Sequence, residues 1–187
     1  VWMGSSARAR IMERAAVLFD ERADELALMC TMEEGKTLAE SRGEIAYGTN
    51  YIEWFAEEGK RMYGDTIPHP SNDKRIVCIK QPVGVVACIT PWNFPFMLNL
   101  SKLVPALMAG NTAVLKAAPD TPWSATYIGK LIAEETDLPA GVLNIITSRD
   151  PADVGDALTG DDRVDVISFT GSTAIGKHIM ARCASSA

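Results

Sequence analysis

The sequence predicts an α/β fold built on a Rossmann-type parallel sheet with flanking helices. An apolar run over residues 83–89 reads as a buried strand, and the segment after it reads as a helix. From there the pattern alternates between predicted strands (112–116, 143–147 and 164–169) and predicted helices (about 123–136, 152–158 and 173–184). Such alternation is typical of parallel strands joined by right-handed helical crossovers.

The amino-terminal region is predicted to be helical. Apolar residues from Ile11 to Met29 recur at helical spacing, with one interruption at Arg22. Ser5 or Ser6 is placed to act as the N-cap of this helix. One face of the helix is therefore expected to contribute to the core.

A second long helix is expected to follow. Thr37 and Glu40 form a capping-box pattern, and helical spacing continues from there to about Tyr63. Residues 65–74 contain two prolines and many polar side chains, which predicts a loop, and residues 75–81 are predicted to form a strand.

Composition and charge exclude several classes of function. The 187 residues are 47% hydrophobic and 22% charged, as in globular proteins, and carry a net charge of −6. Because phosphate backbones bind basic surfaces, we expect no nucleic-acid partner. No apolar run reaches the roughly 18 residues that cross a membrane, and the first residues show no apolar leader, so we expect a cytoplasmic protein with no membrane partner.

The cysteines and histidines indicate no metal site. Cys30, Cys78, Cys88 and Cys183 include no C-x-x-C pair, and the two histidines are far apart in the sequence. Three of the four cysteines lie in apolar or helical patterns and are expected to be buried.

A polar turn, TPWNFP at residues 90–95, follows the first predicted strand. Pro91 ends that strand, so Asn93 lies near its carboxyl end, where open α/β sheets bind ligands. An Asn amide there could donate a hydrogen bond to a developing oxyanion. Alternatively, Asn93 only caps the next helix, with Pro95 at the first helical position. The local sequence favours neither interpretation.

Two further segments have polar groups at predicted strand ends. In FTGSTAIGK, residues 169–177, a helix start with a glycine and a hydroxyl suits a pyrophosphate, although Ser172 is also an ordinary N-cap and Gly176 also permits close helix packing. Lys116 is either an exposed strand terminus or a cation placed for ribose hydroxyls or a phosphate. The G-x-G-x-x-G fingerprint is absent, which disfavours a short-chain or lactate-type dehydrogenase.

Three motifs together resemble the aldehyde dehydrogenase superfamily: ITPWNFP (89–95), KLVPALMAGNTAVLK (102–116) and SFTGSTAIGK (168–177). The segments AEEGKRMYGDTIP (56–68) and IKQPVGVVACITPWNFP (79–95) are most similar to its succinate-semialdehyde dehydrogenase branch. The resemblance covers nearly the whole chain. It implies an aldehyde-dehydrogenase-like fold that is incomplete at both ends, so that residues 1–187 hold the amino-terminal helices and part of the nucleotide-binding domain, without the catalytic and oligomerisation parts.

This resemblance also implies an activity. The full-length protein would be an oxidoreductase that uses NADP or NAD to oxidise a small aldehyde, succinate semialdehyde, to its carboxylic acid, and would form a homo-oligomer. The family's nucleophile lies in a Gly-Gln-x-Cys context and its general base in a Glu-Leu-Gly-Gly segment, and neither occurs in this sequence. The chain alone is therefore expected to be inactive.

The resemblance assigns site residues as well. Asn93 becomes the catalytic oxyanion donor, and Lys102, as a lysine whose stem can run along a helix surface, ranks below it. The residues implied to bind the cofactor are Thr90, Pro91, Trp92, Asn93, Lys116, Pro119, Gly155, Phe169, Gly171 and Ser172.

One position bears on the choice of cofactor. Family members often have a glutamate that repels a 2′-phosphate where this chain has the neutral Pro119. NADP is therefore expected to be accepted, with Asp120 as a neighbouring source of negative charge. The loop 147–151 carries one extra residue relative to the family, and its Arg149 is expected to be an exposed loop arginine.

Two other functions stay open. The chain could be a catalytically inactive nucleotide-binding or assembly fragment, because it lacks the nucleophilic cysteine. It could also belong to a related reductase of acyl phosphates or acyl-CoA, which would share the fold.

Overall fold

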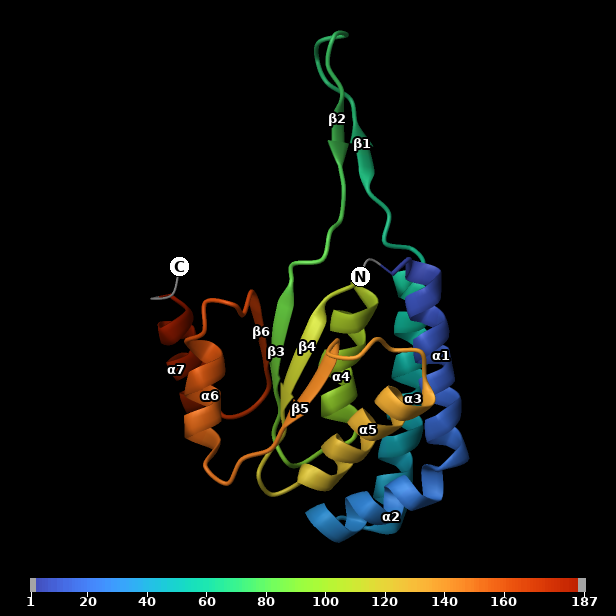
Figure 1. Ribbon diagram of the computed structural model, residues 1–187, viewed down its shortest axis with the longest axis vertical. Coiled ribbons are helices and arrows are strands. Elements are labelled where there is room, and N and C mark those ends of the chain that lie inside the picture. Colours follow the sequence, from blue (N-terminus) through green and yellow to red (C-terminus); the bar gives the residue numbers. More distant parts are fainter. Residues whose placement is uncertain (1–2, 185–187) are drawn as a thin grey trace.

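The computed structural model describes residues 3–184, and its centre is a four-stranded parallel sheet (Figure 1). The strands are ordered β5-β4-β3-β6, and each neighbouring pair runs parallel. Their bounds are β3 (Val85–Ile89), β4 (Thr112–Lys116), β5 (Leu143–Ile146) and β6 (Val166–Phe169). The predicted α/β fold with a parallel sheet is confirmed.

The direction in which strands are added reverses at β3. From β3 the chain passes through α4 to β4 and through α5 to β5, and after α6 it returns to place β6 on the other side of β3. In Figure 1, α6 and α7 lie on one side of the sheet, and α4 and α5 lie on the other. These helices are α4 (Met97–Met108), α5 (Pro122–Glu135), α6 (Pro151–Thr159) and α7 (Thr173–Cys183). The carboxyl ends of β4, β3 and β6 therefore lie next to one another.

The amino-terminal region contains three helices rather than the predicted two: α1 (Ser5–Glu21), α2 (Ala23–Glu34) and α3 (Leu38–Gly59). The chain leaves helical geometry at Arg22, whose guanidinium instead contacts the Glu135 carboxylate at 2.7 Å. The apolar spacing predicted a single helix with an interruption at Arg22. The structure has two helices there, and Arg22 between them forms an ion pair with α5.

The caps of these helices follow the sequence in part. Gly4 occupies the N-cap of α1, so the prediction of Ser5 or Ser6 was wrong. Thr37 and Glu40 form the predicted capping box of α3. This helix ends at Gly59, four residues before the predicted end.

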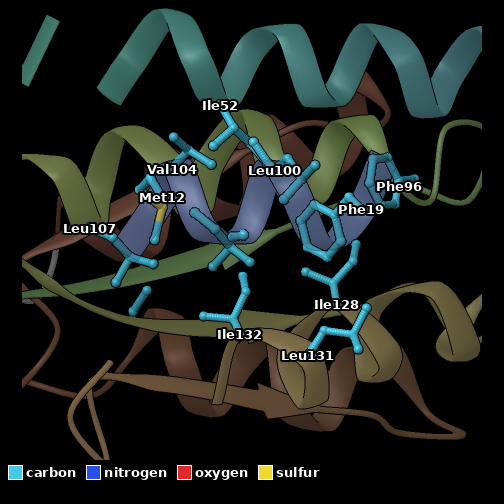
Figure 2. Close-up of a cluster of buried hydrophobic side chains, with 14 of the residues drawn as sticks. Met12, Phe19, Ile52, Phe96, Leu100, Val104, Leu107, Ile128, Leu131 and Ile132 are labelled. Atoms are coloured by element: carbon cyan, nitrogen blue, oxygen red, sulfur yellow. The ribbon is translucent and has the colours of Figure 1, made fainter. Parts of the chain in front are cut away.

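The main core lies between the sheet and the helices α1 to α5. Figure 2 shows that side chains from α1, α3, α4 and α5 meet there, with Phe19 and Phe96 at one end. The rings of Phe19 and Phe96 are fully buried and contact edge to face, with their centroids 5.2 Å apart. The segment that carries the Asn93 turn is thereby fixed to the helical layer.

A two-stranded antiparallel ribbon projects from the body of the molecule (Figure 1). It consists of β1 (Asp65–Ile67) and β2 (Ile76–Cys78), and every residue in both strands is exposed. The predicted loop over 65–74 was therefore partly wrong, and the predicted strand over 75–81 is shorter than expected. Cross-strand hydrogen bonds form the ribbon without a buried face, so no burial pattern in the sequence marks β1.

Two glycines of α3 provide a matched test of the core packing. A Cβ atom on Gly48 would lie 2.7 Å from the Phe96 ring, whereas one on Gly43 would meet nothing within 4 Å. We expect Gly48→Ala to destabilise the full-length protein by about 1–3 kcal/mol because of overpacking. Gly43→Ala should stabilise it by about 1 kcal/mol through helix propensity. Thermal unfolding of both variants checks this, and equal effects would contradict the close contact between α3 and the Phe96 segment.

Candidate functional site

A cleft of about 670 Å³ opens at the carboxyl edge of the sheet, where the strand order reverses. It is lined by the ends of β3, β4 and β6 and by the first turns of α6 and α7. Open α/β sheets bind ligands at such switch points. Nine of the ten predicted cofactor-binding residues line it: Thr90, Pro91, Trp92, Lys116, Pro119, Gly155, Phe169, Gly171 and Ser172.

The amino terminus of α7 faces this cleft. The Ser172 side chain is the N-cap of α7 and accepts a hydrogen bond from the Ile175 amide at 3.3 Å. The first amides of a helix have no intrahelical acceptors, so this end can bind an anion. The hydroxyl proton of Ser172 is available for the same purpose.

The two glycines of the FTGSTAIGK segment differ in how closely they pack against Phe169. A Cβ atom on Gly171 would lie 2.6 Å from the Phe169 ring, and one on Gly176 would lie 3.4 Å from it. Gly171 therefore makes room for the ring of Phe169, whereas a side chain at Gly176 would make an ordinary contact with it. Gly155 differs, because a Cβ atom there would meet nothing within 4 Å.

Lys116 is buried at the end of β4, with 4% of its surface exposed. Its ammonium has one polar contact among the described residues, a long 3.4 Å hydrogen bond to the Ala117 carbonyl. Burial lowers the pKa of Lys116. The interpretation of Lys116 as an exposed strand terminus was therefore wrong, and the structure places a poorly partnered cation in the cleft.

Lys102 is a second buried lysine beside the cleft. It is 8% exposed, and its Nζ donates a 2.7 Å hydrogen bond to the Thr170 hydroxyl directly after β6. Burial lowers its pKa as well. Lys102 was ranked below Asn93 because its stem could run along a helix surface, and its burial contradicts that reason for the ranking. A lysine within the apolar run of α4 was the available signal.

The structure separates Asn93 from the other predicted cofactor residues. Asn93 is exposed and lines a neighbouring hollow that also contains Lys36, Glu44 and Tyr47. Trp92 lines both this hollow and the main cleft. The Asn93 turn is therefore the wall between two concave surfaces.

The capping interpretation of Asn93 was wrong. Helix α4 begins at Met97 with Phe96 in the N-cap position, so neither Asn93 nor Pro95 has the predicted capping role. Among the described residues, the Asn93 side-chain amide makes no hydrogen bond, whereas its backbone carbonyl accepts one from Lys36 at 2.8 Å. This amide is free to donate to a ligand.

Acidic residues also line the main cleft. Asp120 is exposed there, next to Pro119, so the predicted alternative source of negative charge is present. Asp156 is hydrogen bonded to His178 Nε2 at 2.9 Å, and this contact lowers the pKa of Asp156. Arg149 is exposed and does not line the cleft, as the sequence analysis expected.

No cysteine among the described residues lines the cleft or the hollow beside Asn93. Cys30 and Cys88 are buried, which raises the pKa of each thiol to about 12. Cys78 lies on the exposed ribbon and Cys183 is half-buried, so two cysteines rather than the expected three are buried. Within residues 3–184, no group of three or more His, Cys, Asp or Glu side chains is placed to hold a metal ion, and no helix is long and apolar enough to span a bilayer.

A parallel sheet with a switch-point cleft of this composition defines a Rossmann-type α/β domain. The sequence model of the aldehyde dehydrogenase family matches residues 2–187, and the chain belongs to this family. It is 52% identical to an NADP(+) succinate-semialdehyde dehydrogenase of Escherichia coli over 95% of the chain, and 50% identical to a glutarate-semialdehyde dehydrogenase of Pseudomonas putida over 98%.

Solved structures agree in fold. A crystal structure of an NADP-dependent enzyme of Escherichia coli matches with a TM-score of 0.94 at 49% identity, covering 98% of this chain and 38% of that one. An aldehyde dehydrogenase of Brucella melitensis matches with a TM-score of 0.95 at 48% identity, with the same coverage. The chain spans 36% of the length of the Escherichia coli relative and 38% of the Pseudomonas putida relative.

The buried Lys116 predicts a pH-dependent effect on stability. Because the folded pKa is lowered, the fold disfavours the charged ammonium. This cost is complete below the folded pKa and disappears as the pH rises from there through about 10.5, the ordinary pKa of lysine. We expect Lys116→Met to raise the melting temperature of the full-length protein at pH 7, with a gain that shrinks towards about pH 10. Lys130→Met, at an exposed position on α5, is the control. A gain in melting temperature that is equal at pH 7 and at about pH 10 would show that it does not come from the charge of the buried ammonium.

Proposed function

We propose that the full-length protein is an NAD(P)-dependent aldehyde dehydrogenase that oxidises succinate semialdehyde or a similar short acid aldehyde to the carboxylic acid. One observation carries the proposal: the switch-point cleft shares a wall, Trp92, with a hollow that exposes the free amide of Asn93. A nucleotide site and a hydrogen-bond donor for an aldehyde oxygen are thus adjacent.

The residues of the main cleft fit a dinucleotide. Ser172 and the first amides of α7 can bind the pyrophosphate, and Lys116 can bind ribose hydroxyls or a phosphate. Gly155 leaves open space on the α6 side. The neutral Pro119 and the cation of Lys116 favour acceptance of a 2′-phosphate, whereas Asp120 opposes it.

Asn93 is proposed as the oxyanion donor. Its amide can hydrogen bond the aldehyde oxygen as negative charge develops, without changing protonation state. When bound, the cofactor supplies hydride acceptance. Trp92 would hold that end of the cofactor beside the aldehyde, because it lines both concave surfaces.

The nucleophile and the general base would come from parts of the full-length protein other than the described residues. Cys30 and Cys88 are buried as neutral thiols, and among residues 3–184 no cysteine lines the cleft or the hollow beside Asn93. The same observation favours a second candidate for the 187-residue chain taken alone, namely an inactive nucleotide-binding or assembly fragment. The intact mass of the natural protein separates the two, since the fragment has a mass of 20.2 kDa.

The proposed substrate class follows the names of the relatives. They are succinate-semialdehyde, glutarate-semialdehyde and 3-sulfolactaldehyde dehydrogenases, and each of these aldehydes carries an acidic group. The exposed apolar side chains of the ribbon, such as Ile67 and Val77, support the further proposal that the full-length protein is a homo-oligomer. We place it in the cytoplasm on the composition of the sequence.

The activity is tested with the purified full-length protein by following cofactor reduction with succinate semialdehyde, glutarate semialdehyde and an uncharged aldehyde of matched length. We expect the acid aldehydes to react best and NADP to bind at least as tightly as NAD. Pro119→Glu should weaken NADP binding by about tenfold and leave NAD binding nearly unchanged. In the unsubstituted protein, NADP binding about tenfold weaker than NAD binding would refute the cofactor prediction, and absence of oxidation would refute the activity.

Asn93 is tested separately. Asn93→Ala should reduce transition-state stabilisation by about 2 to 4 kcal/mol, seen as a lower kcat, with little change in nucleotide affinity. Unaltered turnover in this variant would remove Asn93 from the mechanism. Asn144→Ala, at an exposed position on β5 away from both concave surfaces, serves as the control and should leave turnover unchanged.

A further inference from the structure

The Asn93 turn is held from the side opposite the main cleft by a lysine between α2 and α3. Lys36 Nζ donates to the Asn93 carbonyl at 2.8 Å and to Glu44 Oε2 at 2.7 Å. The same ammonium lies 4.2 Å from the centroid of the Phe94 ring. One cation therefore contacts two consecutive residues of the turn.

Glu44 continues this contact to the start of α4. Its side chain is 1% exposed, and its Oε1 accepts hydrogen bonds from the amides of Phe96 at 2.8 Å and Met97 at 2.9 Å. Helix α4 has no side-chain cap from its own N-cap residue, so Glu44 satisfies amides that would otherwise be without acceptors. Lys36 supplies the positive charge that this buried carboxylate requires.

The position of Asn93 depends on these contacts. Its side-chain amide has no partner among the described residues, so the contacts of the backbone determine only where the Cα and Cβ of Asn93 lie, and with them the region that the amide can reach. Within the part of the chain that the structure describes, other hydrogen bonds hold the turn on either side of Asn93. The Thr90 hydroxyl donates to Asn99 Oδ1 at 2.7 Å, Asn99 Nδ2 donates to the Pro95 carbonyl at 2.6 Å, and the Leu98 amide donates to the Phe94 carbonyl at 3.0 Å. Lys36 is the described residue whose side chain binds the peptide of Asn93 itself.

We propose that Lys36 and Glu44 are positioning residues that hold the backbone of Asn93 where its amide can reach the reacting oxygen. This inference rests on the proposed function, because it assigns the ion pair to the oxyanion donor of that reaction. A displacement of about 1 Å in a catalytic group can lower a rate by about 100-fold. The Asn93 carbonyl carbon is bonded to the Cα that carries the side chain, so a shift of this carbonyl would move the amide and lower kcat.

A purely structural ion pair gives a different expectation. It would stabilise the fold, and its loss would lower the melting temperature and the amount of active enzyme without acting through Asn93. A positioning pair lowers the kcat of folded enzyme, and its effect disappears when the Asn93 amide is already absent.

The test compares Lys36→Met and Lys36→Arg in the full-length protein, with Lys130→Met as the control at an exposed lysine of α5. We expect Lys36→Met to lower kcat by about tenfold or more, with the dissociation constant of NADP unchanged within about threefold. Lys36→Arg should recover part of kcat, because it restores the charge and a donor. Lys130→Met should match the unsubstituted protein.

A double-mutant cycle with Asn93→Ala decides the origin of the loss. If Lys36 acts through Asn93, the double variant should have the kcat of Asn93→Ala alone. Multiplicative losses, or a kcat for folded Lys36→Met that equals the unsubstituted value, would overturn the proposal. Glu44→Gln, which retains a carbonyl acceptor for the α4 amides but loses the charge, gives the same cycle if Lys36→Met does not fold.

The two proposals fail in different ways. An unsubstituted protein that oxidises no aldehyde would refute the proposed function. A protein that oxidises aldehydes and loses turnover in Asn93→Ala, but shows no coupling between Lys36 and Asn93, would refute only the positioning role.

Discussion

The pairing of β3 with a parallel strand on each edge is the constraint on which the rest of the structure depends. Backbone bonds extend the ladders past the strand ends, with the Thr90 amide bound to the Lys116 carbonyl at 3.4 Å and the Thr170 amide bound to the Ile89 carbonyl at 3.0 Å. These bonds hold three strand ends in register. The cleft, the Trp92-Asn93 turn and the start of α7 all follow from that common edge.

Two lysines at this edge show a conflict between stability and function. Lys116 and Lys102 are both buried, and burial lowers the pKa of both. A buried ammonium is costly unless it is paired. Lys102 donates to the Thr170 hydroxyl, whereas the one partner of Lys116 among the described residues is the Ala117 carbonyl, at a long 3.4 Å. An anionic ligand in the cleft would supply the counter-charge that Lys116 lacks, which is a physical reason to keep a lysine there.

The elements that the sequence predicted well are those with a buried face. Strand Val85–Ile89 and the strands and helices that follow it have apolar residues at regular spacing, which marks them in the sequence. The capping box at Thr37 was also predictable, because its two residues are only three positions apart. The exposed strand Asp65–Ile67 has no such period, and the break at Arg22 coincides with an ion pair 113 residues away in sequence. Nine predicted cofactor residues lie together because strand ends meet at one edge of the sheet. The apolar run around Lys102 was a signal of its burial, whereas its hydrogen bond to Thr170 depends on tertiary packing that the sequence does not show.

The Asn93 turn combines a fixed backbone with a free side chain. The residues around Asn93 are held by the buried Phe96 ring, by Glu44 and by Lys36. The conformational entropy of this backbone is therefore lost when the protein folds and not when a ligand binds. The amide itself is exposed and has no protein partner among the described residues, so it is accessible to a ligand oxygen. A turn that served only to start α4 would have no need of a polar side chain exposed between two concave surfaces. For the proposed role of Asn93 as an oxyanion donor, the backbone of the turn is therefore preorganised, and the helical layer formed by α2 and α3 supports it.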